Sequence, residues 1–107
     1  MSDFDPERIY RQITDAGEEW ADKNAAADLL EETKKTVLAE LMTTFQGSTA
    51  ERERNALATA EYKHHLTSMV AARKESNRAR IRYDSVRVLG EMRRTQESTR
   101  RAEANIR

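Results

Sequence analysis

The stretch Gln46-Gly47-Ser48-Thr49-Ala50-Glu51 is the only turn-like cluster in this sequence of 107 residues, and it decides the expected fold. Gly47 suits the left-handed position that follows a helix, and Ser48 with Glu51 forms a capping box for a new helix. The chain is therefore predicted to reverse direction at a turn over about residues 46–50.

The residues before this turn predict one long helix over about 5–46. Asp5 and Pro6 suit its first turn, where an acidic cap meets the positive end of the helix dipole and a missing N–H costs nothing. An apolar stripe that includes Trp20 continues from there at three- and four-residue steps. A break at Gly17 is the main alternative, because glycine costs about 1 kcal/mol in a helix relative to alanine.

The residues after the turn predict a short helix over about 51–58 and a long helix over about 60–105, with Thr59 as a second cap. Two long helices joined by one short connection predict an antiparallel helical hairpin, coiled-coil-like and all-α. Residues 1–107 are expected to form a single helical domain.

Composition agrees with long solvated helices. Charged residues make up 36% of the chain, with one proline, three glycines and no cysteine, which disfavours a sandwich, a barrel or a disulfide-stabilised fold. The 19 basic and 19 acidic residues are unevenly placed, since residues 1–50 hold 5 basic and 11 acidic residues and residues 51–107 hold 14 and 8. The halves are expected to neutralise each other, because a hairpin places four acidic residues level with three arginines. The acids are Asp15, Glu18, Glu19 and Asp22, and the arginines are Arg87, Arg93 and Arg94.

Five arginines recur at seven-residue steps in the last helix. They are Arg73, Arg80, Arg87, Arg94 and Arg101. Ile81 and Val88 keep the same step, so the arginines are expected to flank a coiled-coil seam. This series is the predicted surface for a protein partner or for nucleic acid.

The last helix has two apolar faces, which predicts self-association. At about 100° per residue, Tyr83, Val86 and Gly90 lie about 140–200° from Ile81 and Val88. We expect the Ile81–Val88 face to pack on the first helix, and Tyr83, Val86 and Gly90 to pack on a second copy. The expected assembly is a homodimer that forms a four-helix bundle.

No pattern in the sequence indicates catalysis. Glu61 and His64 have the E-x-x-H spacing of di-iron bundles, but both are expected to point to solvent, while His65 lies nearer the buried edge. There is no phosphate-binding loop and no nucleophile motif, so the chain is expected to be no enzyme and to hold no cofactor or metal. The apolar runs are too short to span a membrane, and no membrane association is expected.

Nucleic-acid binding is the alternative function. The segment Arg73–Arg107 holds 11 basic and 5 acidic residues, and a basic helix can neutralise phosphates. The interleaved acids argue against it, as does the lack of aromatic residues after Tyr83 on which bases would stack.

Two strings resemble small helical proteins of bacteriophages and prophages. They are Asp15-Ala16-Gly17-Glu18-Glu19-Trp20-Ala21-Asp22 and the segment from Arg80-Ile81-Arg82-Tyr83 to Glu103. This resemblance implies a small protein that acts by binding in the cytoplasm of a bacterial host. It would be a replication or recombination accessory, or an inhibitor of host defences such as CRISPR effectors.

Overall fold

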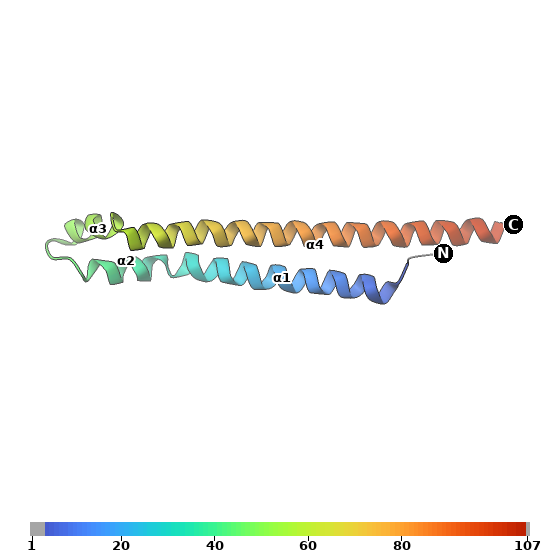
Figure 1. Cartoon of the computed structure of the whole chain (residues 1–107), viewed down its shortest axis with the longest axis horizontal. Helices are drawn as coiled ribbons and strands as arrows, with labels where there is room; N and C mark the ends of the chain where they lie inside the picture. The colour runs from blue at the N-terminus through green and yellow to red at the C-terminus, as the bar shows by residue number, and fades with distance from the viewer. Residues whose placement is uncertain (1–3, 107) are drawn as a thin grey trace. The chain divides into compact units, whose positions relative to one another are not determined.

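A computed structural model of the protein describes residues 4–106, which hold four helices and no strand (Figure 1). The helices are α1 (Pro6–Glu32), α2 (Lys34–Met42), α3 (Thr49–Leu57) and α4 (Ala60–Ile106). The predicted all-α class is therefore confirmed. The chain divides into two compact units, which we call the terminal unit (the described residues up to Ala21 and those from Arg78 onward) and the turn unit (Asp22–Asn77).

The start of α1 follows from its capping residues. The Asp5 carboxylate accepts hydrogen bonds from the backbone N–H groups of Glu7 at 3.1 Å and Arg8 at 3.3 Å. These donors have no partner within the helix, so the carboxylate satisfies them and also lies at the positive end of the helix dipole. Gly17 lies within α1 and does not break it.

A break occurs instead at Thr33, so the continuous helix predicted over 5–46 is interrupted there. The Thr33 hydroxyl donates to the carbonyl oxygens of Leu29 at 2.9 Å and Leu30 at 3.2 Å. A threonine that bonds back onto the preceding turn bends or ends a helix. The imidazole Nε2 of His65 also lies 2.9 Å from the Leu30 carbonyl oxygen. A residue of α4 therefore provides a further hydrogen-bond partner for the backbone at the break.

The turn between α2 and α3 has the predicted chemistry. Gly47 adopts φ 117°, a left-handed conformation that side chains rarely allow. The Ser48 hydroxyl accepts from the backbone N–H of Glu51 at 3.2 Å and caps α3. The Thr59 hydroxyl likewise accepts from the N–H of Tyr62 at 3.1 Å, so α4 begins at the second cap that the sequence predicts.

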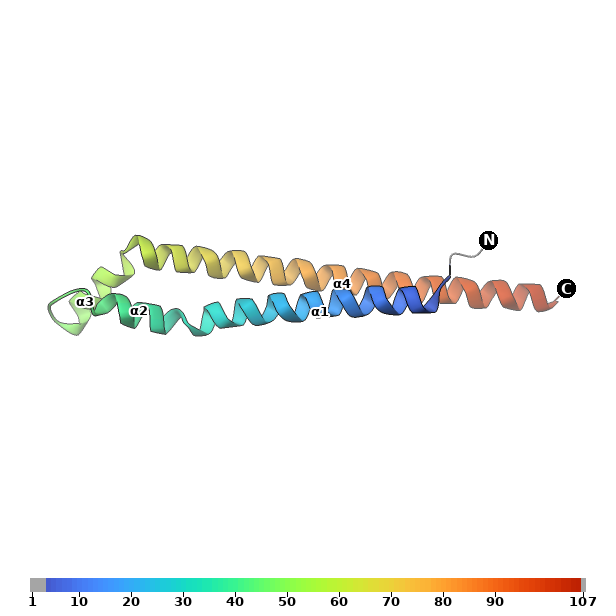
Figure 2. The ribbon, with the colours of Figure 1, turned by 60° about the horizontal axis from the view of Figure 1, so that its bottom comes forward.

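In the terminal unit, the first part of α1 runs antiparallel to the part of α4 that faces it, and the last turns of α4 extend beyond the start of α1 (Figure 1, Figure 2). A Cβ placed on Gly90 would come within 2.9 Å of Ile9, and one placed on Gly17 would come within 3.2 Å of the Tyr83 ring. Residue numbers therefore rise along α1 in the direction in which they fall along the facing part of α4, so the two helices are antiparallel. The two glycines let a side chain of the opposite helix approach the backbone closely.

The two faces of α4 in this unit are reversed relative to the sequence-based prediction. Tyr83 and Val86 are half-buried and Gly90 is buried, on the side that packs on α1 of the same chain. Four apolar side chains lie on the other side, and we call them the outer face. They are Ile81, Val88, Leu89 and Met92, exposed by 64, 49, 46 and 56%.

The turn unit has a thin core built mainly from small residues. Ala27 and Ala56 are fully buried, and Tyr62 is 6% exposed. The Arg52 Nε donates to the carbonyl oxygen of Met42 at 3.3 Å, which ties α3 to the end of α2. Alanines in these positions allow close helix packing but bury little apolar surface, so polar contacts carry more of the specificity here.

Candidate interaction surfaces

Arg73 is engaged within the chain and does not offer a free contact surface. Its guanidinium, on α4, donates to Asp28 at 2.7 Å, Glu31 at 3.1 Å and Asn24 at 2.8 Å, all on α1. The hydrogen bonds accepted by Asp28 and then by Glu31 raise the pKa of Arg73 above its usual value, so the side chain stays charged. This corrects the prediction for the first member of the arginine series.

Arg80 and Arg87 are held loosely along one edge of the terminal unit. Both reach Asp84, at 3.9 and 3.8 Å, and their side chains are 65 and 53% exposed. Each guanidinium also lies over an aromatic ring, Arg80 at 6.0 Å from the centroid of Trp20 and Arg87 at 5.8 Å from that of Tyr83. Such exposed, long ion pairs contribute little to stability, so both cations are accessible to a partner.

Arg94 and Arg101 complete the series toward the end of α4. Arg101 lies 3.8 Å from Glu97 and is 70% exposed. Arg94 borders a cavity between α1 and α4 of the terminal unit. Arg80, Arg87, Arg94 and Arg101 therefore form an exposed basic edge.

The sequence-based prediction missed Arg82, which makes a close interhelical ion pair. Its Nη2 lies 2.5 Å from Glu19 on α1. The predicted neutralisation between an acidic first helix and a basic last helix is thus present, but Glu19 meets Arg82 rather than Arg87 or Arg94. The register follows from the contact of Gly17 with Tyr83, which aligns these two parts of the helices.

The outer face of α4 adds an apolar surface on the helix that carries the basic edge. Ile81, Val88 and Met92 lie one to two helical turns apart on one stripe, with Leu89 at its side. A shallow groove of about 410 Å³ runs along it between Val88 and Gln96. Single exposed apolar residues are normal, whereas a contiguous stripe on a helix is a candidate interaction surface.

The two adjacent histidines have different environments. His64 is exposed, whereas His65 is half-buried and its Nε2 donates to the carbonyl oxygen of Leu30. Glu61 is exposed too, so the E-x-x-H pair points away from the packed side of the turn unit. No group of three or more potential metal-ligating side chains occurs within residues 4–106.

Replacing His65 with alanine is expected to lower the free energy of unfolding by about 1 kcal/mol, the usual net contribution of one hydrogen bond. The substitution leaves a partly buried carbonyl with fewer partners at the break between α1 and α2. The measurement is urea denaturation followed by circular dichroism. His64→Ala is the matched control and is expected to change stability by less than about 0.5 kcal/mol. Equal losses in the two variants would contradict a role for the Leu30 contact.

Comparison with known proteins assigns no family. No family model matches the chain, and no curated protein or solved structure is significantly similar to it. None of the described helices is both long and apolar enough to cross a bilayer.

Proposed function

We propose that this chain is a non-enzymatic helical interaction protein that acts by binding another protein. The observation that carries the proposal is the outer face of α4, where four large apolar side chains remain exposed on the helix that also carries the basic edge. An apolar stripe flanked by charge is the surface by which helical proteins select a partner. The resemblance of residues 15–22 and 80–103 to phage proteins supports an accessory or inhibitor of a host or phage complex in a bacterial cytoplasm.

The proposed assembly is an antiparallel helical hairpin that pairs with a second copy into a four-helix bundle. The hairpin is supported within each unit by contacts whose residue numbers rise on one helix and fall on the other, such as Ile9 with Gly90 and Asp28 with Arg73. Pairing is supported by the outer face, because a two-helix layer leaves this stripe in water. Ile81, Val88 and Met92 replace Tyr83, Val86 and Gly90 as the self-association residues.

Sedimentation velocity tests the assembly directly. The chain is expected to sediment as a species of twice its 12.3 kDa mass at micromolar concentration. Val88→Lys combined with Met92→Lys is expected to weaken association by about 100-fold or more, because two apolar side chains each contribute about 1.5–3 kcal/mol when buried.

Leu29→Lys is the matched control for this experiment. Leu29 is 61% exposed on α1, so the substitution places one lysine on an exposed apolar side chain that is not part of the outer face. It is expected to leave the mass unchanged. A monomer for the unaltered chain, or equal dissociation in both variants, would overturn the assignment of the outer face.

Nucleic-acid binding is the second candidate function, favoured by the exposure of Arg80, Arg87 and Arg101. Binding through such a basic edge neutralises phosphates and weakens steeply as salt rises. A mobility-shift assay with labelled DNA and RNA across salt distinguishes the two candidates. No shift at about 50 mM salt would remove this alternative, since electrostatic binding is strong at low ionic strength.

A further inference from the structure

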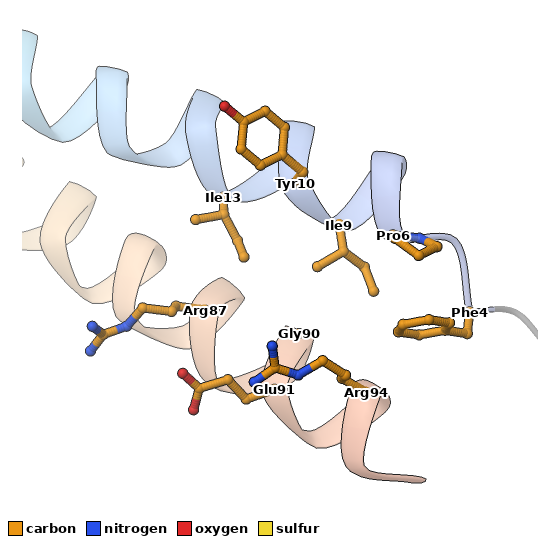
Figure 3. A pocket seen from close by; sticks show the side chains of 9 residues that line it. All are labelled: Phe4, Pro6, Ile9, Tyr10, Ile13, Arg87, Gly90, Glu91 and Arg94. Atoms are coloured by element: carbon orange, nitrogen blue, oxygen red, sulfur yellow. The ribbon is translucent and has the colours of Figure 1, made fainter. Parts of the chain in front are cut away.

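A cavity of about 310 Å³ lies in the terminal unit, between the start of α1 and α4 (Figure 3). Its wall on the α1 side is apolar and consists of Phe4, Pro6, Ile9, Tyr10 and Ile13. In Figure 3 the side chains of Ile9 and Ile13 point across the space toward α4, and the Phe4 ring closes one end. The volume is at the lower end of the range of small-molecule sites, about 300–1,000 Å³.

Gly90 explains why this cavity has a defined shape. It lies opposite Ile9 and Ile13, and a Cβ built on it would come 2.9 Å from Ile9 Cγ2 and 3.5 Å from Ile13 Cδ1. The two isoleucines therefore rest against the backbone of α4. Because β-branched side chains have few rotamers in a helix, they form a stiff wall.

The rim of the cavity on α4 is cationic. Arg87 and Arg94 both border the cavity, together with Glu91 between them, which leaves an excess of one positive charge. Arg87 has its long ion pair to Asp84, at 3.8 Å. Among residues 4–106, no carboxylate lies within ion-pair distance of the Arg94 guanidinium. In Figure 3 the Arg94 side chain runs back along α4 toward Gly90.

We infer that this cavity binds a small hydrophobic carboxylate, with its apolar body against Ile9 and Ile13 and its carboxylate on Arg94. An apolar wall beside an unpaired guanidinium matches both halves of such a ligand, and a charge-assisted hydrogen bond to arginine is stronger than a neutral one. A cationic ligand would meet Arg87 and Arg94 as like charges. The apolar wall of the site does not depend on self-association, because Ile9 and Ile13 approach Gly90 within one chain, whereas Ile81, Val88 and Met92 of the outer face are not among the residues that line the cavity.

The four isoleucines of the chain provide the test, with 4-phenylbutyrate as the probe. Ile9 and Ile13 line the cavity, whereas Ile81 and Ile106 lie outside it. In methyl NMR spectra of isoleucine-labelled protein, 4-phenylbutyrate is expected to shift the Ile9 and Ile13 signals in a saturable way and to leave Ile81 and Ile106 unchanged. A change in self-association would instead shift the Ile81 signal, because Ile81 lies on the outer face. Failure of the proposed dimer and failure of this site therefore affect different signals.

Two comparisons test the charge. The neutral 4-phenylbutanamide and the cationic 4-phenylbutylammonium are expected to bind at least about fivefold more weakly than the carboxylate. Arg94→Gln is expected to weaken the binding of 4-phenylbutyrate by about five- to tenfold. Arg101→Gln, one heptad further along α4, is expected to leave the affinity unchanged. The inference is overturned if Ile9 and Ile13 do not shift, if all four signals shift together, if the three probes bind equally, or if both variants behave alike.

Discussion

Replacing Trp20 with alanine is expected to lower the free energy of unfolding by about 2–3 kcal/mol, somewhat less than the 3–5 kcal/mol typical of a fully buried aromatic residue. Trp20 on α1 meets Tyr83 on α4 with ring centroids 5.5 Å apart and planes inclined by 33°. Arg80 lies over the same indole, at 6.0 Å from its centroid. The substitution removes this ring contact from a unit whose buried residues, Ala79 and Gly90, are small.

Urea denaturation at one fixed protein concentration measures this loss, because association would otherwise shift the midpoint. Tyr10→Ala is the control, since Tyr10 is also aromatic and also on α1 but is 70% exposed. It is expected to change stability by no more than about 0.5 kcal/mol. A similar loss in both variants would show that the Trp20–Tyr83 contact does not hold the terminal unit together.

Replacing Gly90 with leucine is expected to cost about 2 kcal/mol, within the range for overpacking a close helix contact. The substituted Cβ alone would come 2.9 Å from Ile9, so α1 and α4 must separate or Ile9 must change its rotamer. Helix propensity predicts the opposite sign, because leucine favours a helix over glycine by about 1 kcal/mol. The direction of the change therefore reports directly on whether this face packs within the chain.

Ser98→Leu is the control for Gly90→Leu in the same denaturation experiment. Ser98 is an exposed residue of α4, and leucine there is expected to change stability by no more than about 0.5 kcal/mol. If Gly90→Leu were as stable as the unaltered chain or more so, the packing of Gly90 against Ile9 would be wrong. The outer face would then become the candidate for the contact with α1.

The candidate surfaces were predicted from sequence only in part. Seven-residue spacing found the arginine series, and four of its five members lie on the basic edge. Spacing did not separate Arg73 from the others, because its three partners on α1 come from residues more than 40 positions away. The seven-residue spacing also did not identify Arg82, because its ion pair with Glu19 depends on the register of the two helices.

Local chemistry explains the features of the fold that the sequence predicts. Asp5, Ser48 and Thr59 each accept a backbone N–H within three residues, so the start of each capped helix can be read from neighbours in the chain. The end of α1 is different, because the Leu30 carbonyl is held both by a near neighbour, Thr33, and by His65 of α4. A continuous apolar stripe does not reveal that break.

By itself, the sequence determined that this chain is helical, where it turns at Gly47, and that the last helix has two apolar faces. Only the tertiary structure decided which of those faces packs on α1. Periodicity reports that a face is apolar but not what covers it, and by apolar content the Ile81–Val88 face is the stronger candidate. Close approach decides otherwise, because Gly17 and Gly90 let the Tyr83–Gly90 side meet α1 at contact distance and leave Ile81, Val88, Leu89 and Met92 in water.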